Sequence, residues 1–180
     1  MITVISGTNR KDSECLNFAQ QYYDFFKAKT DEDLKLLSLE EIPHDWFHAD
    51  MYEKAAQSES LRALQDEFIL PASKFLFVTP EYNGSFPGAL KLFIDACSVR
   101  QYKANFKGKK AALVGVATGR AGNLRGMDHL TGVLHHVGTI VMPNMLPISR
   151  IETLMNENRE ITDAATLRVM ELHAEEFLAF

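Results

Sequence analysis

The sequence has few cysteines and no long apolar run. Its two cysteines, Cys15 and Cys97, are too few for a disulfide framework and are typical of a reducing compartment. No stretch approaches the roughly 20 apolar residues that a transmembrane helix needs. The first residues, M-I-T-V-I-S-G, also lack the basic start and long apolar stretch of a signal peptide. We therefore expect a cytoplasmic protein with no membrane partner.

An excess of positive charge is also missing. The formal net charge is -5 at pH 7, which argues against a nucleic-acid partner, because broad contact with phosphates requires a basic face. The composition, 46% hydrophobic and 24% charged, excludes a disordered chain. No internal repeat and no linker rich in Gly, Pro or Ser divides the sequence. We therefore predict that residues 1–180 form a single domain.

Short apolar, β-branched runs alternate along the chain with segments of helical periodicity. The predicted strands cover residues 2–6, 34–39, 74–79, 110–117 and 138–142. Helical spacing of apolar residues is found between them and again near the C-terminus, whereas 43–58 has no clean period and is predicted to be irregular. Continuous apolar strands separated by helices indicate an α/β fold with a parallel sheet covered on both faces. We predict a three-layer, doubly wound sheet of five strands in the order 2-1-3-4-5.

In such a sheet, ligands bind at the carboxyl ends of the strands where the strand order reverses, between strands 1 and 3. The loop at 6–15, S-G-T-N-R-K-D-S-E-C, follows strand 1. Its hydroxyls, its arginine and the N–H groups at the start of the next helix are suited to binding a phosphate. An ordinary N-cap at Ser13 and a solvated Arg10 remain an alternative. Because neither a G-x-G-x-x-G nor a Walker A pattern is present, the loop favours a mononucleotide.

The loop at 79–91 follows strand 3 and contains two prolines, two glycines and an aromatic ring. A flat heteroaromatic ligand needs backbone polar groups along its edge and an apolar contact on its face. A rigid loop bounded by prolines offers both. The alternative is a structural turn with Pro87 in the first turn of the following helix, which the density of special residues makes the weaker interpretation.

Three motifs carry a resemblance to a known family. The run P-E-Y-N-G-S-F-P-G-A-L-K at 80–91 resembles the signature of the NAD(P)H-dependent FMN reductases, which include quinone, azo-dye and chromate reductases. G-T-N-R-K-D-S at 7–13 resembles their phosphate loop, and A-T-G-R-A-G-N at 117–123 is similar to their glycine-rich loop at the flavin edge. The resemblance implies a flavodoxin-like fold, FMN as cofactor, NADPH or NADH as co-substrate, and a homodimer or homotetramer.

The resemblance also implies roles for particular residues. The FMN phosphate is expected to bind to Thr8, Arg10, Ser13 and the backbone of Glu14 and Cys15. The ribityl chain and the isoalloxazine ring are expected to lie along Pro80, Glu81, Tyr82, Asn83, Gly84 and Ser85. Thr118 and Gly119 are expected at the far edge of the ring, with Arg120 and Asn123 as neighbours.

The sequence departs from the family pattern at three of these positions or close to them. Cys15 stands where many members have a phosphate-binding Asn, so one side-chain contact is lost. Leu92 replaces an Asn and Ala96 replaces a Trp on the helix after the second motif, which concerns the subunit interface more than the flavin site.

The predicted function is an FMN-dependent oxidoreductase. It takes hydride from NAD(P)H and passes electrons to a small-molecule acceptor, a quinone, azo compound, metal oxyanion or flavin, by a ping-pong exchange. A flavodoxin-type electron carrier and a non-catalytic flavin-binding protein are the alternatives. The cofactor carries the chemistry, so no catalytic side chain is assigned.

Two further features of the sequence invite a chemical interpretation. His44 and His48 lie four residues apart, but the sequence places no third ligand near them, and we expect no metal site. Cys15 is expected at a helix N-terminus, where the pKa of a thiol is lowered.

Overall fold

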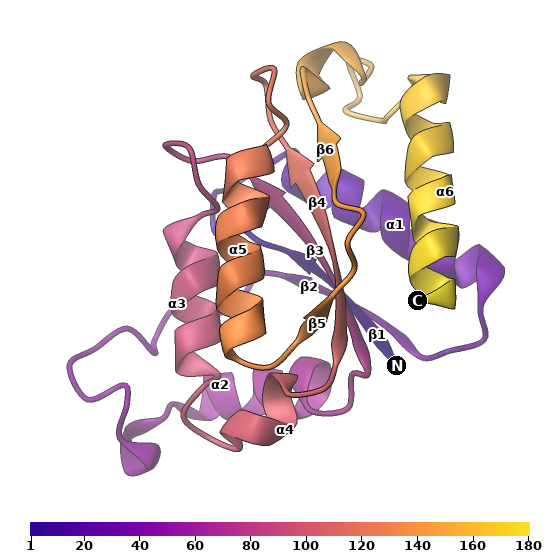
Figure 1. Ribbon diagram of the computed structural model, residues 1–180. Coiled ribbons are helices and arrows are strands. Elements are labelled where there is room, and N and C mark those ends of the chain that lie inside the picture. Colours follow the sequence, from indigo (N-terminus) through magenta and orange to yellow (C-terminus); the bar gives the residue numbers. More distant parts are fainter.

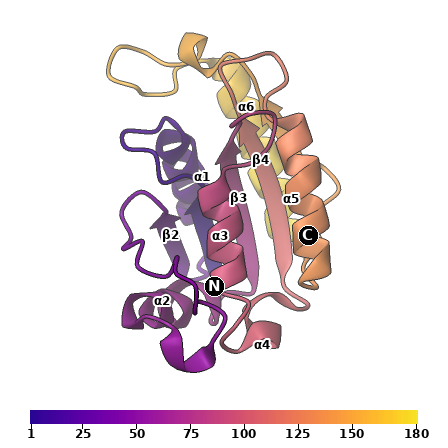
Figure 2. The ribbon, with the colours of Figure 1, turned by 90° about the vertical axis from the view of Figure 1, so that its left-hand side faces the viewer.

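The computed structural model describes residues 1–180 and has a parallel sheet between two layers of helices (Figures 1 and 2). The main strands run in the order β2-β1-β3-β4-β5, and every pair is parallel. This order confirms the predicted flavodoxin-like topology. The strands are β1 (Ile2–Ser6), β2 (Leu34–Ser38), β3 (Lys74–Pro80), β4 (Lys110–Val116) and β5 (Ile140–Val141).

Alternate side chains of each central strand enter different apolar cores. Phe75 and Phe77 of β3 pack in the core beneath α3 (Gly88–Ala96) and α5 (Leu124–His136). Leu76 and Val78 of the same strand pack in the core beneath α1 (Cys15–Lys29) and α6 (Ala164–Ala179). Because both faces are covered, β1, β3 and β4 need apolar residues at nearly every position, which explains the continuous apolar runs of the sequence.

The fifth strand is shorter than the predicted range 138–142 and is continued by a second segment. Ile140 and Val141 pair with the start of β4, and β6 (Leu146–Ile148) pairs with its end, from Val114 to Val116. No strand was predicted over the segment that forms β6. It contains Pro147, which has no N–H and is tolerated here because β6 lies at the edge of the sheet. The second segment brings the chain back to the carboxyl end of β4.

The remaining segments agree with the predicted pattern, with local additions. The helix predicted around 61–69 consists of α2 (Glu59–Leu64) and a π-helical turn, Gln65–Ile69, and it ends before Pro71. Residues 43–58 are irregular apart from a 3-10 turn at Lys54–Ala56. A short helix, α4 (Tyr102–Phe106), was not predicted. No helix combines the length and the apolarity that crossing a bilayer requires.

Ala96 lies in the core and not at a surface. Its side chain is fully buried, and its carbonyl oxygen accepts a hydrogen bond of 2.9 Å from Nε2 of Gln57. Ala96 is thus covered within one chain, next to the irregular segment that carries Gln57. The expected link between this substitution and a subunit interface stays a prediction.

A buried hydrogen-bonded chain joins α1, α6 and the segment between β5 and β6. His173 Nε2 lies 3.1 Å from the carbonyl oxygen of Asn144, which only accepts, so this nitrogen carries the proton. His173 Nδ1 then accepts from the Tyr22 hydroxyl, 3.0 Å away. Burial lowers the pKa of His173 below its usual value, and the imidazole is held neutral.

We expect this histidine to make folding sensitive to mild acid. The unfolded chain takes up a proton on His173 near the ordinary pKa of 6.5, whereas the folded chain resists it, so stability falls as the pH drops below that value. The slope for one proton is at most about 1.4 kcal/mol per pH unit. In urea unfolding at neutral and mildly acidic pH, wild type should lose more free energy of unfolding than His173→Gln. The same substitution at the exposed His136 should leave the wild-type pH dependence in place; equal behaviour of all three proteins would contradict the prediction.

Candidate active site

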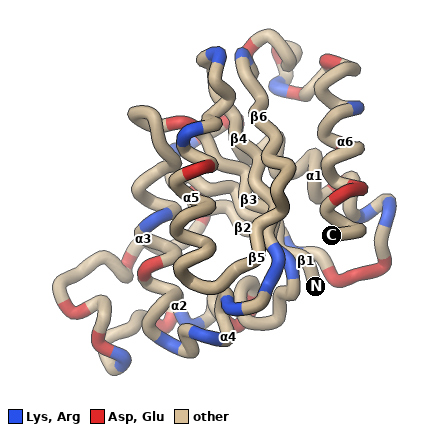
Figure 3. Tube along the Cα trace, viewed as in Figure 1, with Lys and Arg blue, Asp and Glu red and all other residues tan.

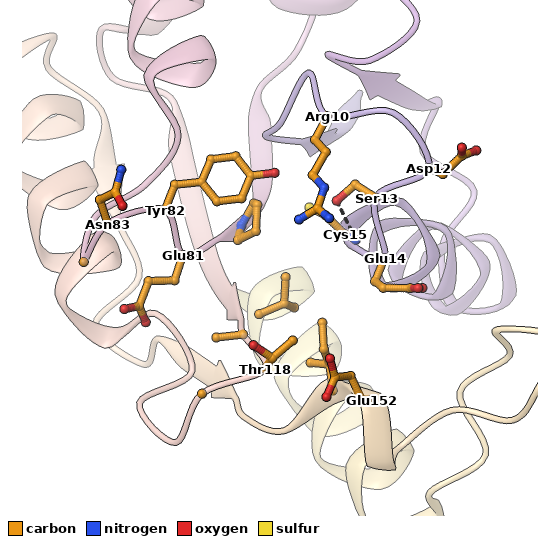
Figure 4. Close-up of a pocket in the computed structure, with 16 residues that line it drawn as sticks. Arg10, Asp12, Ser13, Glu14, Cys15, Glu81, Tyr82, Asn83, Thr118 and Glu152 are labelled. Carbon is orange, nitrogen blue, oxygen red and sulfur yellow. Dashed lines mark hydrogen bonds between the residues drawn. The ribbon is translucent and has the colours of Figure 1, made fainter.

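A cleft of about 560 Å³ opens at the carboxyl ends of β1, β3 and β4. Its volume lies within the range of small-molecule sites, roughly 300–1,000 Å³. Figure 4 shows its walls, which come from the loops after these strands and from the turn after β6. The lining residues are Arg10, Asp12, Ser13, Glu14, Cys15, Pro80, Glu81, Tyr82, Asn83, Gly84, Val116, Ala117, Thr118, Gly119, Ile151 and Glu152. Of the predicted site residues, only Thr8 and Ser85 are not among them, and the expected neighbours Arg120 and Asn123 do not line the cleft either.

The loop after β1 turns sharply because Gly7 has no side chain. A Cβ at Gly7 would lie 2.9 Å from Leu90 Cδ2 and 3.1 Å from the carbonyl oxygen of Val78. Thr8 follows and is buried, so it does not line the cleft. Its hydroxyl accepts from the N–H of Arg10 at 3.1 Å and is hydrogen-bonded to the Tyr82 hydroxyl at 2.8 Å. Thr8 thus fastens the first loop to the second.

One end of the cleft is suited to an anion. The backbone N–H groups of Ser13 and Glu14 donate to no protein atom, and α1 begins at the next residue, Cys15. The exposed Arg10 lines the same end and forms no ion pair within the chain. In Figure 4 its guanidinium group points toward Ser13 and Cys15. Free N–H groups at a helix start together with an arginine are the groups that bind a phosphate.

Cys15 does not have the expected reactive thiol. Its side chain is buried, and its Sγ donates to the carbonyl oxygen of Val78 at 3.1 Å. Burial raises the pKa of the Cys15 thiol to about 11, which outweighs its position at the helix start. The thiol points into the core, and the backbone N–H of Cys15 donates to Ser13 Oγ at 3.3 Å.

The loop after β3 is a tight hairpin turn. Tyr82 and Ser85 exchange two backbone hydrogen bonds of 2.9 and 3.2 Å, and Asn83 and Gly84 both have positive φ, 52° and 76°. Asn-Gly is the residue pair that such a turn favours. The Tyr82 ring stands beside the cleft with its hydroxyl toward the first loop (Figure 4). Ser85 instead turns away and bonds His129 Nδ1 at 2.9 Å, which anchors the turn to α5.

Asn123 connects the loop after β4 to the end of β3. It is buried with φ of 62°, and its Nδ2 donates to the carbonyl oxygens of Thr79 and Pro80 at 3.0 and 2.9 Å. Asn123 therefore lies beneath the site as a support and does not line the cleft. Thr118 and Gly119 form the exposed part of this loop and line the cleft, as expected for the third motif.

Five lining residues were not predicted: Asp12, Val116, Ala117, Ile151 and Glu152. Ile151 and Glu152 lie at the cleft because β6 pairs with the end of β4. The N–H of Ile151 then donates to the Ala117 carbonyl oxygen at 3.3 Å. No sequence pattern marks them, since they depend on a three-residue strand. No group of three or more His, Cys, Asp or Glu side chains is close enough together to hold a metal ion.

The parallel sheet and the cleft at its β1–β3 switch point define a protein of the flavodoxin-like class with a site for a mononucleotide. FMN fits the residues present, because it combines one phosphate with one flat ring system, and the cleft has one anion-binding end beside an aromatic side chain. Residues 1–153 match the profile of the family described as NADPH-dependent FMN reductase. The chain therefore belongs to this family. The membership confirms an oxidoreductase with FMN and NAD(P)H as its cofactors.

Individual relatives agree with this assignment. A 2-hydroxy-1,4-benzoquinone reductase of Burkholderia sp is 31% identical over 124 residues, which are 68% of this chain and 67% of that protein. A quinone reductase of Pseudomonas putida is 32% identical over 128 residues, 71% of this chain and 65% of that protein. The flavoenzyme NAD(P)H:(acceptor) oxidoreductase FerB of Paracoccus denitrificans superposes with a TM-score of 0.77 at 30% identity, covering 99% of this chain and 94% of FerB. The alignments span between 49% and 67% of the length of three curated relatives.

Proposed function

We propose that this protein is an FMN-dependent oxidoreductase that uses NAD(P)H to reduce a quinone, and that other small oxidants, such as azo compounds, metal oxyanions or free flavins, also serve as acceptors. Two of the relatives described above are named as quinone reductases, which supports the choice of acceptor. The observation that carries the proposal is the cleft itself, in which Arg10 and the free N–H groups of Ser13 and Glu14 lie at one end and Tyr82 lies alongside.

When bound, FMN would supply the redox chemistry, hydride transfer from NAD(P)H and electron transfer to the acceptor in a second, separate half-reaction. The protein binds and orients it. Arg10, Ser13 and the backbone of Glu14 and Cys15 bind the phosphate, and Thr8 holds Arg10 and Tyr82 in place. The remaining proposed contacts are Pro80, Glu81, Tyr82, Asn83, Gly84, Thr118 and Gly119, with Ser85 fixing the turn through His129.

We further propose that residues 1–180 form one domain, that the protein is cytoplasmic, and that it forms a homodimer or homotetramer. The two cysteines are free and buried, which supports a reducing environment. The exposed Phe47, whose side chain is 75% accessible, supports an assembly, because large aromatic side chains are enriched at protein interfaces.

An anaerobic titration of the FMN-loaded protein with NADPH and then NADH tests the function. We expect the nucleotide to bleach the oxidised flavin band and a quinone to restore it. Comparing the bleaching by NADPH with the bleaching by NADH gives the nucleotide preference. If dithionite reduces the bound flavin but neither NADPH nor NADH reduces it, the result would favour the electron-carrier alternative. A protein that does not bind FMN would overturn the site.

A further inference from the structure

The segment between β6 and α6 folds back onto the loop after β1 through Arg159. This residue lies beyond residues 1–153, the part that matches the family. Figure 3 shows that the segment carries both acidic and basic residues. Arg159 Nε lies 3.0 Å from both carboxylate oxygens of Glu14, and Nη2 donates to the carbonyl oxygen of Asp12 at 2.6 Å. Residues 145 positions apart in the sequence are thereby joined beside the cleft.

Neighbouring side chains hold this contact in one geometry. Asn17 Nδ2 donates to Glu14 Oε2 at 2.9 Å and to the carbonyl oxygen of Arg159 at 3.1 Å. Asn156 Oδ1 accepts from the N–H groups of Asn158 and Glu160, both at 3.0 Å, which closes the turn that carries Arg159. The guanidinium group is therefore presented to Glu14 by a structured turn and not by a freely rotating side chain.

The charge of Glu14 makes this contact relevant to FMN. Glu14 lines the anion-binding end of the cleft, and its own N–H is one of the two free donors there. Its carboxylate points away from Arg10 in Figure 4, but it still lies beside that end and repels a phosphate through space unless it is neutralised. Arg10 forms no ion pair with Glu14. Arg159 approaches Glu14 from outside the cleft, since it is not among the lining residues.

We propose that Arg159 is a positioning residue for the FMN phosphate. It neutralises Glu14 and fixes the backbone of the first loop at Asp12, so that the N–H groups of Ser13 and Glu14 remain available to the phosphate. The inference rests on the proposed function and adds a residue from the C-terminal segment to the flavin site. It assigns Arg159 no contact with FMN itself.

The test compares the binding of FMN and of riboflavin, which lacks the phosphate, to the full-length chain after removal of its flavin. Quenching of flavin fluorescence gives both dissociation constants for wild type, Arg159→Met, Glu14→Gln and the double variant. Arg168→Met is the control, because Arg168 Nη1 pairs with Glu171 Oε2 on α6 at 3.0 Å, and Glu171, unlike Glu14, does not line the cleft.

We expect Arg159→Met to weaken FMN binding about five- to tenfold at low salt, with a smaller loss at high salt. Riboflavin binding should not change, and Arg168→Met should behave as wild type. Glu14→Gln should bind FMN at least as well as wild type, because it removes the repulsion together with the need for Arg159. The double variant should regain the part of the affinity that Arg159→Met loses through the charge of Glu14, but not the part that depends on the contact with Asp12.

Three results would overturn the inference: unchanged FMN binding in Arg159→Met, an equal loss for riboflavin, or a double variant as weak as Arg159→Met. The second would mean that the contact only maintains the fold. If wild type itself binds no FMN, the proposed function fails. If wild type binds FMN and Arg159→Met binds it equally well, only the role of Arg159 fails.

Discussion

Replacing Arg10 with methionine is expected to lower the affinity for FMN by about 10- to 150-fold, the factor that corresponds to a charge-assisted hydrogen bond of roughly 1.5–3 kcal/mol. Arg10 is the only basic side chain that lines the cleft, where the acidic residues Asp12, Glu14, Glu81 and Glu152 also lie. Its guanidinium group is free of ion pairs within the chain, so its charge is available to a ligand. Riboflavin should bind both proteins equally.

The neighbouring Lys11 provides the control. It is exposed on the same loop but does not line the cleft, so Lys11→Met should change FMN binding only slightly through long-range charge. Equilibrium titration of each flavin-free protein with FMN and riboflavin is the measurement. An equal loss for both flavins in Arg10→Met would show that Arg10 supports the loop and does not bind the phosphate.

The fold was predictable because its main strands are buried on both faces. β1, β3 and β4 are continuous apolar runs ended by Gly, Pro or polar residues, and their alternation with helices leaves few topologies. β6 was not predictable in the same way. It has three residues, one of them Pro147, and it exists only because the end of β4 offers it a partner distant in the sequence.

At the site, too, features set by local sequence could be predicted, and features that depend on long-range contacts could not. The Asn-Gly turn at 83–84 and the glycine after β1 are set by backbone conformation, and local sequence therefore marks them. Glu152 reaches the cleft, and Arg159 the first loop, through tertiary contacts that leave no local pattern. The error on Cys15 has a physical cause: two effects oppose each other at a helix start, and burial outweighs the helix dipole because the thiol points at β3.

Replacing Gly115 with alanine is expected to destabilise the fold by about 1–3 kcal/mol, the usual cost of overpacking, and to weaken FMN binding. A Cβ at Gly115 of β4 would lie 2.1 Å from the carbonyl oxygen of Gly122 and 3.1 Å from Asn123 Cβ. Both atoms belong to the loop after β4, which cannot move away from the strand. On its far side, a Cβ at Gly122 would already lie 2.8 Å from the backbone nitrogen of Ile148 in β6. The loop is wedged between two strands, so the added methyl group must displace Asn123.

Whether Gly115→Ala raises or lowers the free energy of unfolding distinguishes overpacking from secondary-structure propensity. Alanine is favoured over glycine in a regular element by roughly 0.5–1 kcal/mol, so propensity alone predicts that Gly115→Ala stabilises the protein. Gly132→Ala in α5 is the matched control, because a Cβ there meets no atom within 4 Å and only the propensity gain remains. The free energy of unfolding measured in urea should therefore fall for Gly115→Ala and rise for Gly132→Ala. The affinity for FMN should fall only for Gly115→Ala.

Because Asn123 holds Thr79 and Pro80 at the start of the second loop, a displaced Asn123 would disturb two of the three loops that form the cleft. A Gly115→Ala protein as stable as Gly132→Ala, with unchanged affinity, would mean that the third loop is free to move without affecting the flavin site.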